Sequence, residues 1–368
     1  MRELWKGNEA VAEAAIRAGV QGYFGYPITP QTELLEWMSR RMPEEGRVFV
    51  QAESELAAIN MVYGAASCGV RAMTSSSSPG VSLMMEGISY ISGTELPMLL
   101  VDVMRGGPGL GNIAPAQADY NQIVHGGGHG DYHSIVLAPA SVQEAVDLTG
   151  LAFDLAERYR MMGVVLLDGS IGQMMEPAEL PAKRPIPAGR PEWAVGMNVG
   201  WKRPRRVLTS INMEPALQEK TNFRIASRWL EACSREVRYK DYFLEGARIV
   251  VVGFGSSGRV ALTAVRNARA AGMPVGLLRP ISLAPFPERV IADLAGEVDG
   301  MLVVEMNGGQ MLDDVRRAVA GRCPVDFYGR MGGMLPFPEE ILSELQRLAA
   351  GGWEADPRAA WLARMEAR

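Results

Sequence analysis

Two carboxylates, Glu53 and Glu55, stand where an extended segment gives way to a helix. Residues 48–50 predict a short buried strand, and an apolar, alanine-rich helix is expected from Glu55 towards residue 67, with Ser54 as its cap. Open α/β sheets bind ligands at the carboxyl ends of their strands, and a carboxyl group in apolar surroundings has a raised pKa that suits proton transfer. Two acids also simply favour a helix N-terminus, so this stretch alone leaves both interpretations open.

A second candidate lies in the turn at residues 26–30, Tyr-Pro-Ile-Thr-Pro, which follows a predicted strand at residues 21–25. Pro27 and Pro30 restrict the backbone and present the Thr29 hydroxyl at the carboxyl end of that strand. Thr29 could instead cap a helix whose first residue is Pro30, with the helix running on from near residue 31. The two roles are compatible.

Arg105 is the third candidate, since it lies between the continuous apolar strand expected at residues 97–103 and a glycine loop at residues 106–112. A strand of this kind is typical of a parallel sheet that is covered on both faces. The guanidinium fork suits a carboxylate or a phosphate. Residues 75–80, Ser-Ser-Ser-Ser-Pro-Gly, follow another strand. These small residues either admit a ligand close to the backbone or form a solvated loop.

The three histidines, His125, His129 and His133, fall in one glycine-rich segment. Their clustering suggests a metal site, but the glycines leave the loop too pliant to preset a coordination shell. An active-site loop or lid is the better interpretation.

Strands and helices alternate through residues 1–175, which predicts a parallel, doubly wound domain. Its first helix is expected at residues 8–18 with Asn8 as cap, and Ser141 with Glu144 forms a capping box for the helix ending at residue 158. The last strand of this unit is expected at residues 164–167. Prolines then break residues 176–212, a linker with a basic stretch at residues 202–206, before a long helix at residues 215–237.

A second α/β unit opens with a strand and a G-x-G-x-x-G match at Gly253, Gly255 and Gly258. A dinucleotide site also needs a group at the end of the next strand, residues 275–278, to hold the ribose. Arg279 stands there and would favour a phosphorylated nicotinamide cofactor. A lone fingerprint followed by Pro-Phe-Pro at residues 285–287 makes this the weaker hypothesis.

Composition narrows the classes of function. The 368 residues carry a net charge of −5, which gives no case for a nucleic acid or an anionic membrane as partner. Three widely spaced cysteines cannot hold an iron–sulfur cluster within this chain. No signal segment or apolar run of membrane-spanning length is visible, so a soluble, cytoplasmic protein is expected.

Four motifs occur in order: residues 26–30, the Glu-Ser-Glu-Leu-Ala-Ala segment from Glu53, Arg105 with its glycine loop, and residues 285–287. Together they resemble the alpha-type subunit of a 2-oxoacid:ferredoxin oxidoreductase that uses thiamine diphosphate. Residues 104–112, 126–132 and 171–176 are most similar to the branched-chain (2-oxoisovalerate) branch. The 2-oxoglutarate and pyruvate branches remain alternatives.

The resemblance implies an α/β fold with two doubly wound domains. Residues 1–180 would bind the aminopyrimidine ring of thiamine diphosphate, and residues 245–345 would resemble the carboxy-terminal domain of transketolase. Residues 181–244 would be the proline-rich linker with its long helix, and residues 346–368 a polar helical tail.

The resemblance also implies roles for single residues. Glu55, rather than Glu53, matches the Ser-Glu-x-x-Ala pattern of the catalytic glutamate that bonds the pyrimidine ring, and Pro27 matches a residue that lines the ring pocket. Thr29 and Arg105 match residues near the substrate, the arginine on its carboxylate. Asn112 and His129 are weaker substrate-binding candidates.

The chain lacks the parts that hold the other end of the cofactor. A Gly-Asp-Gly motif with a later asparagine would hold the diphosphate and Mg²⁺, and Leu-Asp-Gly at residues 167–169 does not match it. The resemblance therefore implies a beta-type partner with the diphosphate and Mg²⁺ site, and gamma-type and ferredoxin-like subunits with the iron–sulfur clusters. Ferredoxin and coenzyme A would be the other reactants. An NADP-dependent oxidoreductase using residues 253–258 is the alternative.

Overall fold

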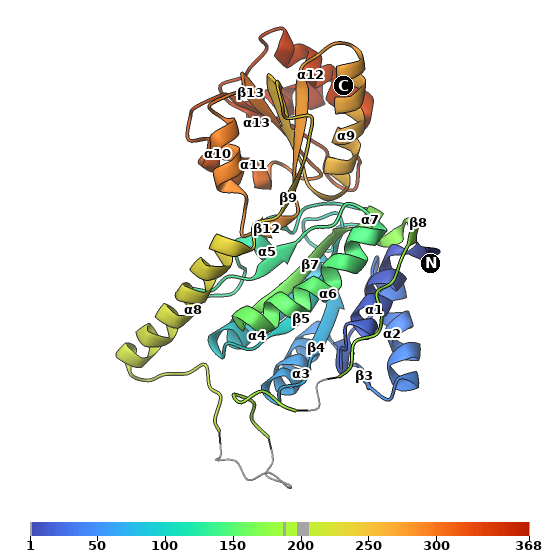
Figure 1. Cartoon of the computed structure of the whole chain (residues 1–368), viewed down its shortest axis with the longest axis vertical. Coiled ribbons are helices and arrows are strands. Elements are labelled where there is room, and N and C mark those ends of the chain that lie inside the picture. Colours follow the sequence, from blue (N-terminus) through green and yellow to red (C-terminus); the bar gives the residue numbers. More distant parts are fainter. Residues whose placement is uncertain (1, 187–188, 197–205, 368) are drawn as a thin grey trace.

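The computed structural model describes residues 2–186, 189–196 and 206–367, and its two α/β regions are stacked along the long axis of the molecule (Figure 1). The basic residues 202–205 of the linker lie outside the described residues. Within the described part of the chain, no helix is both long enough and apolar enough to cross a membrane.

The N-terminal region is built on a seven-stranded sheet. In spatial order its strands are β12 (Ser282–Ala284), β6 (Ile135–Leu137), β7 (Met162–Asp168), β5 (Met98–Met104), β4 (Ala72–Ser76), β2 (Gly22–Gly25) and β3 (Val48–Gln51). Every neighbouring pair is parallel except β12 with β6, which is antiparallel. The expectation that β7 ends this unit is therefore incomplete, because β12 comes from the C-terminal half of the sequence.

Helices cover both faces of this sheet, as the apolar strand β5 predicts. On one face lie α1 (Gly7–Arg17), α2 (Thr32–Glu44) and α6 (Val142–Tyr159), and on the other α3 (Glu55–Ser67) and α4 (Ser78–Gly93). Leu99, Val101 and Val103 of β5 pack towards the first group, whereas Leu100 and Met104 pack towards the second. This alternation places the even-numbered residues of β5 on the side of α3 and α4.

Shorter elements complete the N-terminal region. They are the two-stranded sheet of β1 (Glu3–Lys6) and β8 (Met175–Ala178), and the helices α5 (Tyr120–Val124) and α7 (Gly169–Gln173).

Several local predictions are confirmed, and others are wrong for identifiable reasons. Ser54 and Ser141 cap α3 and α6, and each side chain accepts a hydrogen bond from the backbone amide of the third residue of its helix. Asn8 does not cap α1, because it lies inside the helix and its amide group donates to the carbonyl of Pro30. Neither Thr29 nor Pro30 opens α2, whose cap position is held by residue 31.

The strand at residues 48–50 is not buried as predicted. It forms part of β3, the outermost strand of the sheet, and its Val48 side chain is about half exposed. Burial of an edge strand depends on the strand order, which the local sequence does not specify.

The C-terminal region has a five-stranded sheet. In spatial order its strands are β14 (Val325–Gly329), β13 (Gly300–Glu305), β10 (Ile249–Val252), β11 (Val275–Pro280) and β9 (Tyr239–Tyr242), and only β9 is antiparallel to its neighbour. Its helices are α9 (Gly255–Ala270), α10 (Glu288–Leu294), α11 (Gln310–Val319), α12 (Pro338–Ala349) and α13 (Pro357–Glu366). The tail helix α13 packs on this sheet, since Trp361 contacts Phe327 edge-on and donates to the carbonyl of Gly329.

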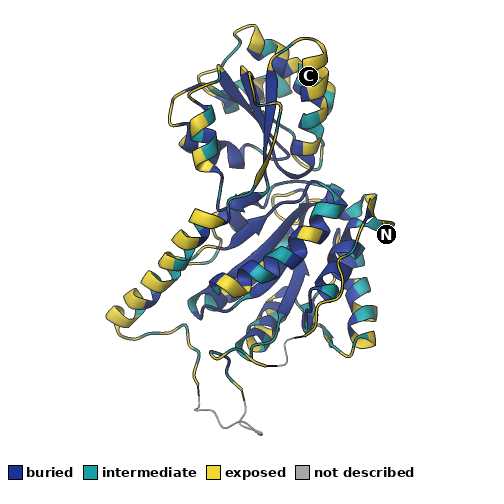
Figure 2. Ribbon diagram, viewed as in Figure 1, coloured by how far each residue is buried: buried dark blue, intermediate teal, exposed yellow. Residues whose placement is uncertain are grey.

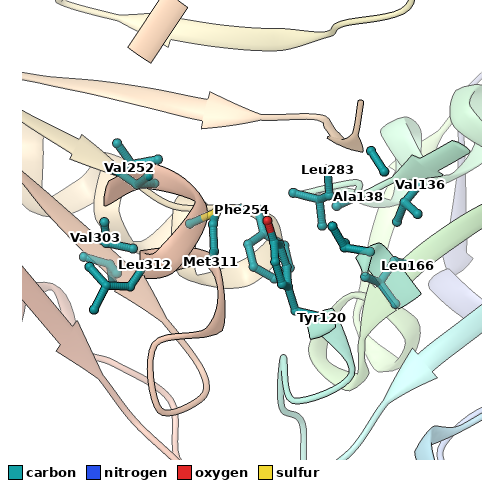
Figure 3. Close-up of a cluster of buried hydrophobic side chains, with 14 of the residues drawn as sticks. Tyr120, Val136, Ala138, Leu166, Val252, Phe254, Leu283, Val303, Met311 and Leu312 are labelled. Carbon is teal, nitrogen blue, oxygen red and sulfur yellow. The ribbon is translucent and has the colours of Figure 1, made fainter. Parts of the chain in front are cut away.

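The two regions share one continuous apolar core. Figure 3 shows the ring of Tyr120 between side chains of β6 and β7 on one side and side chains of β10 and β13 on the other. The rings of Tyr120 and Phe254 lie 5.7 Å apart at this junction. The long helix α8 (Pro215–Arg235) extends beside the junction, and its outward residues are exposed (Figure 2).

Candidate functional site

Glu55 and Glu53 differ sharply in their surroundings. Glu55 is the first residue of α3 and is 5% exposed, whereas Glu53 is exposed. The Glu55 carboxylate has no hydrogen-bond or ion-pair partner among the residues that the structure describes. A buried carboxylate without a partner in its own chain is costly, and it suits a group that meets a ligand.

Small residues make the space in which Glu55 sits. A Cβ added to Gly80 would stand 2.4 Å from Glu55 Oε1 and 2.2 Å from Ser76 Oγ, so only glycine fits at that position. The hydroxyls of Ser76 and Ser77 are buried and have no partner within the described chain. These orphaned polar atoms beside a buried carboxylate fit a polar heterocycle such as the aminopyrimidine ring of thiamine diphosphate.

Arg105 is buried at the carboxyl end of β5, with 6% of its surface exposed. Its Nη1 donates to the carbonyl of Thr29 at 2.9 Å and its Nη2 to the carbonyl of Leu110 at 2.9 Å, while Nε has no partner in the described chain. The guanidinium is thus fixed by neutral carbonyls, and it meets no carboxylate within 4 Å among the residues that the structure describes. Its positive charge is available to an anionic ligand.

The other predicted residues divide into those near Arg105 and those away from it. Thr29 contacts Arg105 through its carbonyl, and its side chain and that of Pro27 are exposed. Asn112 closes the glycine loop on itself and donates to the carbonyl of Gly332 in the C-terminal region at 2.8 Å. The loop after β5 is therefore tied to both regions.

The histidine segment lies further along α4. The His129 carbonyl accepts from Ser89, three turns along α4 from Ser78, which corresponds to roughly 16 Å of helix. His125 bonds Asp314, and His133 stacks on Trp229. No cluster of three or more possible metal ligands was found among the described residues. His125 and His133 line a cavity of about 860 Å³ that also includes residues 285–287.

A cleft of about 460 Å³ lies between the two regions and has Arg105 in its wall. Its other charged lining residue is Asp119, which sequence reasoning missed. Asp119 Oδ2 accepts from Ser78 Oγ at 2.6 Å, and the same hydroxyl accepts from the Arg105 backbone amide at 3.0 Å. Ser78 thus connects the acid to the strand end that carries the arginine.

Asp119 faces a second buried acid, Asp102, on the α4 side of β5. Burial raises the pKa of Asp119 to about 6, although the hydroxyl of Ser78 opposes the shift. Burial also raises the pKa of Asp102 well above its usual range, with the charge of Asp119 adding to the effect. Burial and the neighbouring charge of Asp119 therefore disfavour ionisation of Asp102. An isolated Asp in a strand gives no sequence signal for this arrangement.

The glycine fingerprint is occupied by the protein itself, which overturns the NADP hypothesis. Asp168, at the end of β7, accepts from the Ser256 amide at 2.7 Å and from the Ser256 hydroxyl at 2.5 Å. A Cβ on Gly255 would stand 2.6 Å from Asp168 Oδ2, so the carboxylate fills the position where a dinucleotide phosphate would lie. Gln117 binds the same turn through the carbonyl of Phe254.

Arg279, proposed for the cofactor's second phosphate, is also engaged. It is 3% exposed and pairs with Glu144 of α6 at 2.6 Å. Both elements of the dinucleotide pattern therefore join the C-terminal region to the N-terminal region.

Comparison with known proteins gives two family models that together span most of the chain. Residues 13–223 match the thiamine-diphosphate-binding domain of pyruvate flavodoxin/ferredoxin oxidoreductases. Residues 247–341 match core domain II of pyruvate:ferredoxin oxidoreductase.

Two relatives from methanogens align over nearly their whole length. The chain is 50% identical over 347 residues to ketoisovalerate oxidoreductase subunit VorB of Methanothermobacter thermautotrophicus, covering 94% of this chain and 98% of that protein. It is 37% identical over 364 residues to 2-oxoglutarate synthase subunit KorA of Methanothermobacter marburgensis, covering 92% and 97%.

Solved structures share the fold. A 2-oxoglutarate:ferredoxin oxidoreductase from Magnetococcus marinus, with 2-oxoglutarate, coenzyme A and succinyl-CoA bound, is similar with a TM-score of 0.81 and 28% identity. The match covers 94% of this chain and 65% of that longer chain. A split gene transketolase, at 14% identity and a TM-score of 0.57 over 93% of this chain and 97% of that one, shares the fold alone.

Proposed function

The chain belongs to the pyruvate flavodoxin/ferredoxin oxidoreductase family, and we propose that it contributes the pyrimidine-binding half of an active site that oxidises 2-oxoisovalerate. It is a subunit of a 2-oxoacid oxidoreductase, an enzyme component that works with partner subunits. The family model over residues 13–223 makes thiamine diphosphate the cofactor.

The buried, unpartnered carboxylate of Glu55 is the observation that carries this proposal. When bound, thiamine diphosphate supplies the nucleophilic carbon and the electron sink that decarboxylation of a 2-oxoacid needs. Glu55 would hold a proton against the pyrimidine ring nitrogen, and the hydroxyl of Ser76 lies ready to bond a neighbouring polar atom. Pro27 would line the ring pocket from the turn after β2. Protein carboxyls placed in this way act as general acids and bases.

Arg105 would orient the substrate. The carbonyls of Thr29 and Leu110 fix its guanidinium, and the unpartnered Nε leaves one edge free for the carboxylate beside the reacting carbonyl. A charged hydrogen bond of this kind contributes about 1.5–3 kcal/mol. Thr29 would bound the same space, and Asn112 would act by holding the loop closed. We keep His129 as the weakest substrate-binding candidate.

Exposed apolar side chains close to Glu55 in the fold support the inference that a partner subunit covers this face. Leu56 and Leu83 are 45% and 56% exposed on α3 and α4, and Leu110 of the glycine loop is 78% exposed. Apolar groups that gather around half an active site suit coverage by another protein. We propose that a beta-type subunit covers this face and brings the diphosphate and Mg²⁺ site.

We further propose that gamma-type and ferredoxin-like subunits carry the iron–sulfur clusters. The three cysteines of this chain, Cys68, Cys233 and Cys323, are all free and far apart in sequence. Electrons would pass to ferredoxin and the acyl group to coenzyme A. The complex would work in the cytoplasm.

The choice of 2-oxoisovalerate rests on the 50% identity to a ketoisovalerate oxidoreductase subunit, against 37% to 2-oxoglutarate synthase subunits. 2-Oxoglutarate and pyruvate are the alternatives within the family. We also propose functional domains at residues 1–180 and 245–345, joined by the linker and helix at 181–244 and followed by the tail at 346–368.

The test is to purify the native complex and to measure reduction of a viologen dye with coenzyme A and each 2-oxoacid. We expect the highest kcat/KM for 2-oxoisovalerate and a requirement for thiamine diphosphate and Mg²⁺. A higher kcat/KM for 2-oxoglutarate or pyruvate would reassign the substrate, and turnover without thiamine diphosphate would refute the site.

A further inference from the structure

The turn at residues 26–30 follows β2 and presents the exposed side chains of Pro27 and Thr29. Its two prolines have no backbone N–H to donate. The carbonyls of Tyr26, Thr29 and Pro30 accept hydrogen bonds from side chains that lie outside the turn. The position of the turn on the sheet therefore depends on those side chains.

The Pro30 carbonyl accepts two hydrogen bonds from side-chain amides. Asn8 Nδ2 donates to it at 2.7 Å, and Gln173 Nε2 donates to it at 2.8 Å. The same two nitrogens donate to Glu33 Oε2, at 2.7 Å and 2.9 Å. A primary amide has two hydrogens, so each side chain directs one to the carbonyl and one to the carboxylate. We call Asn8, Glu33 and Gln173 the Pro30 clamp.

The clamp is built on helices that also contact each other. Gln173 is the last residue of α7, and a Cβ added to Gly169, the first residue of α7, would stand 3.3 Å from Pro30 Cγ. Asn8 belongs to α1, whose first amide donates to the carbonyl of Met174 at 3.0 Å. The two amides therefore reach Pro30 from a common support.

Arg105 is one peptide group away from the clamp. Its Nη1 donates to the carbonyl of Thr29 at 2.9 Å, and this carbonyl belongs to the peptide group that ends at the Pro30 nitrogen. Because a peptide group is planar, a shift of Pro30 moves the carbonyl and the guanidinium that bonds it. The Tyr26 end of the turn has a separate partner, Gln31 Nε2 at 3.3 Å.

We propose that Gln173 is a positioning residue for the 2-oxoacid, because its bond to the Pro30 carbonyl fixes the Thr29 carbonyl and, through it, the guanidinium of Arg105. This inference rests on the proposed function, since it assigns Arg105 to the substrate carboxylate. Gln173 acts through the turn and not by contact with the substrate. An arginine clamps a carboxylate effectively only where its donors are held close to bonding geometry.

The experiment compares the assembled wild-type complex with Gln173→Met, which keeps the length of the side chain and removes both hydrogen bonds. Gln143→Met is the matched control, since both glutamines are half-buried. Gln143 Nε2 also donates to one carboxylate, Asp147 at 3.0 Å, and to one carbonyl, Glu179 at 3.1 Å, and neither partner belongs to the turn. We measure kcat and KM for 2-oxoisovalerate, and the affinity for thiamine diphosphate by calorimetry.

We expect Gln173→Met to raise the KM for 2-oxoisovalerate about tenfold. Its kcat and its affinity for thiamine diphosphate should change less than about twofold, because the Tyr26 end of the turn keeps its own partner. Gln143→Met should leave all three quantities unchanged. A role of Gln173 in folding alone would lower the amount of active complex, and with it the apparent kcat, at an unchanged KM.

The double variant with Arg105→Met tests the route of the effect. If Gln173 acts through the guanidinium, Gln173→Met should raise KM by no more than about twofold once Arg105 has been replaced. The same tenfold rise in both backgrounds would refute the inference, because Gln173 would then act independently of Arg105.

Other outcomes separate this inference from the proposed function. If Arg105→Met raises KM and Gln173→Met does not, Gln173 does not position the substrate, while the proposed function stands. If the wild-type complex oxidises no 2-oxoacid, both fail. Should Gln173→Met not assemble, Glu33→Ala takes its place, because it removes the carboxylate that orients both amides. A raised KM in that variant is expected, and an unchanged KM refutes the inference.

Discussion

The two sheets end in opposite ways at their carboxyl edges. At the N-terminal edge, the Glu55 carboxylate and the Nε of Arg105 are buried and have no partner in the described chain. At the C-terminal edge, the helix N-terminus after β10 is filled by Asp168, and Arg279 is paired with Glu144. The two sheets have the same architecture, but the polar groups at the N-terminal edge lack partners among the described residues (the unsatisfied edge), whereas those at the C-terminal edge are bonded by other side chains of the chain (the satisfied edge).

This contrast shows how to recognise function in a repeated fold. Parallel α/β sheets offer ligand sites at their carboxyl ends by geometry alone. Such an edge can bind a ligand where its polar groups have no partner within the chain. Where other side chains of the same chain bond those groups, the edge instead forms a contact between two parts of the protein. The glycine fingerprint at residues 253–258 forms such a contact, between the C-terminal and the N-terminal region.

Replacing Glu55 tests the unsatisfied edge and should have the largest effect. Glu55→Gln keeps the shape but removes the acidic proton, so exchange of the thiazolium proton and turnover should fall by about 10³-fold. Because the carboxylate has no partner in the chain, the free energy of unfolding should not decrease. The measurements are proton exchange by NMR in the assembled complex and urea denaturation.

The matched control is Glu53→Gln, two residues away and exposed. It should exchange and turn over at close to the wild-type rate. Loss of exchange in Glu53→Gln with normal exchange in Glu55→Gln would show that the other acid serves the cofactor.

Replacing Asp168 tests the satisfied edge. The asparagine nitrogen of Asp168→Asn cannot accept from Ser256, which bonds Asp168 through both its amide and its hydroxyl. We expect the free energy of unfolding to fall by about 3 kcal/mol, measured by urea denaturation of the full chain.

The exposed residue Asp241 provides the control, since Asp241→Asn should leave the midpoint of urea denaturation unchanged. If Asp168→Asn were as stable as the wild type and bound NADP(H), the turn would be a ligand site after all, and the contrast between the two edges would disappear.

Replacing Arg105 separates the effect of its positive charge from that of its planar guanidinium group, which can donate several hydrogen bonds at once. Arg105→Lys keeps the charge but cannot reach Thr29, Leu110 and a substrate together, so the KM for the 2-oxoacid should rise about tenfold. Arg105→Met should raise it further, with thiamine diphosphate affinity retained. Loss of cofactor affinity with an unchanged KM would instead make Arg105 a cofactor ligand.

The smallest effect concerns Glu305, a buried acid at the C-terminal edge that has partners. Its carboxylate accepts from the amides of Met311 and Leu312, and burial raises its pKa to about 7. The folded chain therefore holds this proton more tightly than the unfolded chain. The stability that the proton contributes is fully present at acidic pH and is lost as pH rises through about 7.

The contribution of Glu305 to the free energy of unfolding should be about 1 kcal/mol smaller at pH 8 than at pH 6. Glu305→Gln should remove that part of the pH dependence. Urea denaturation at the two pH values measures it, with the exposed Glu297→Gln as control. A wild-type slope that persists in Glu305→Gln would assign the pH dependence to other buried acids.

Sequence reasoning was strongest where the signal is local. The caps Ser54 and Ser141 and the apolar strand β5 follow from hydrogen-bonding chemistry and periodicity within a few residues, and the structure confirms them. The placement of Glu55 at the first turn of α3 is confirmed in the same way. Its catalytic role stays a prediction.

Contacts between distant segments could not be predicted. Asp168 meets Ser256 and Asp119 meets Ser78 across long stretches of sequence, and neither acid stands in a pattern that marks its partner. The exposure of Val48 likewise follows from strand order, which the alternation of strands and helices leaves undetermined.

The pairing of β12 with β6 constrains how this chain can be synthesised. The N-terminal sheet becomes complete on that side only when Ser282–Ala284 has left the ribosome, long after β6 itself. Until then the buried residues of Ile135–Leu137 form an open strand edge, which is prone to pair with other chains. A fragment that stops after the linker would keep this edge permanently. The two halves are therefore one unit of biosynthesis and should be expressed together.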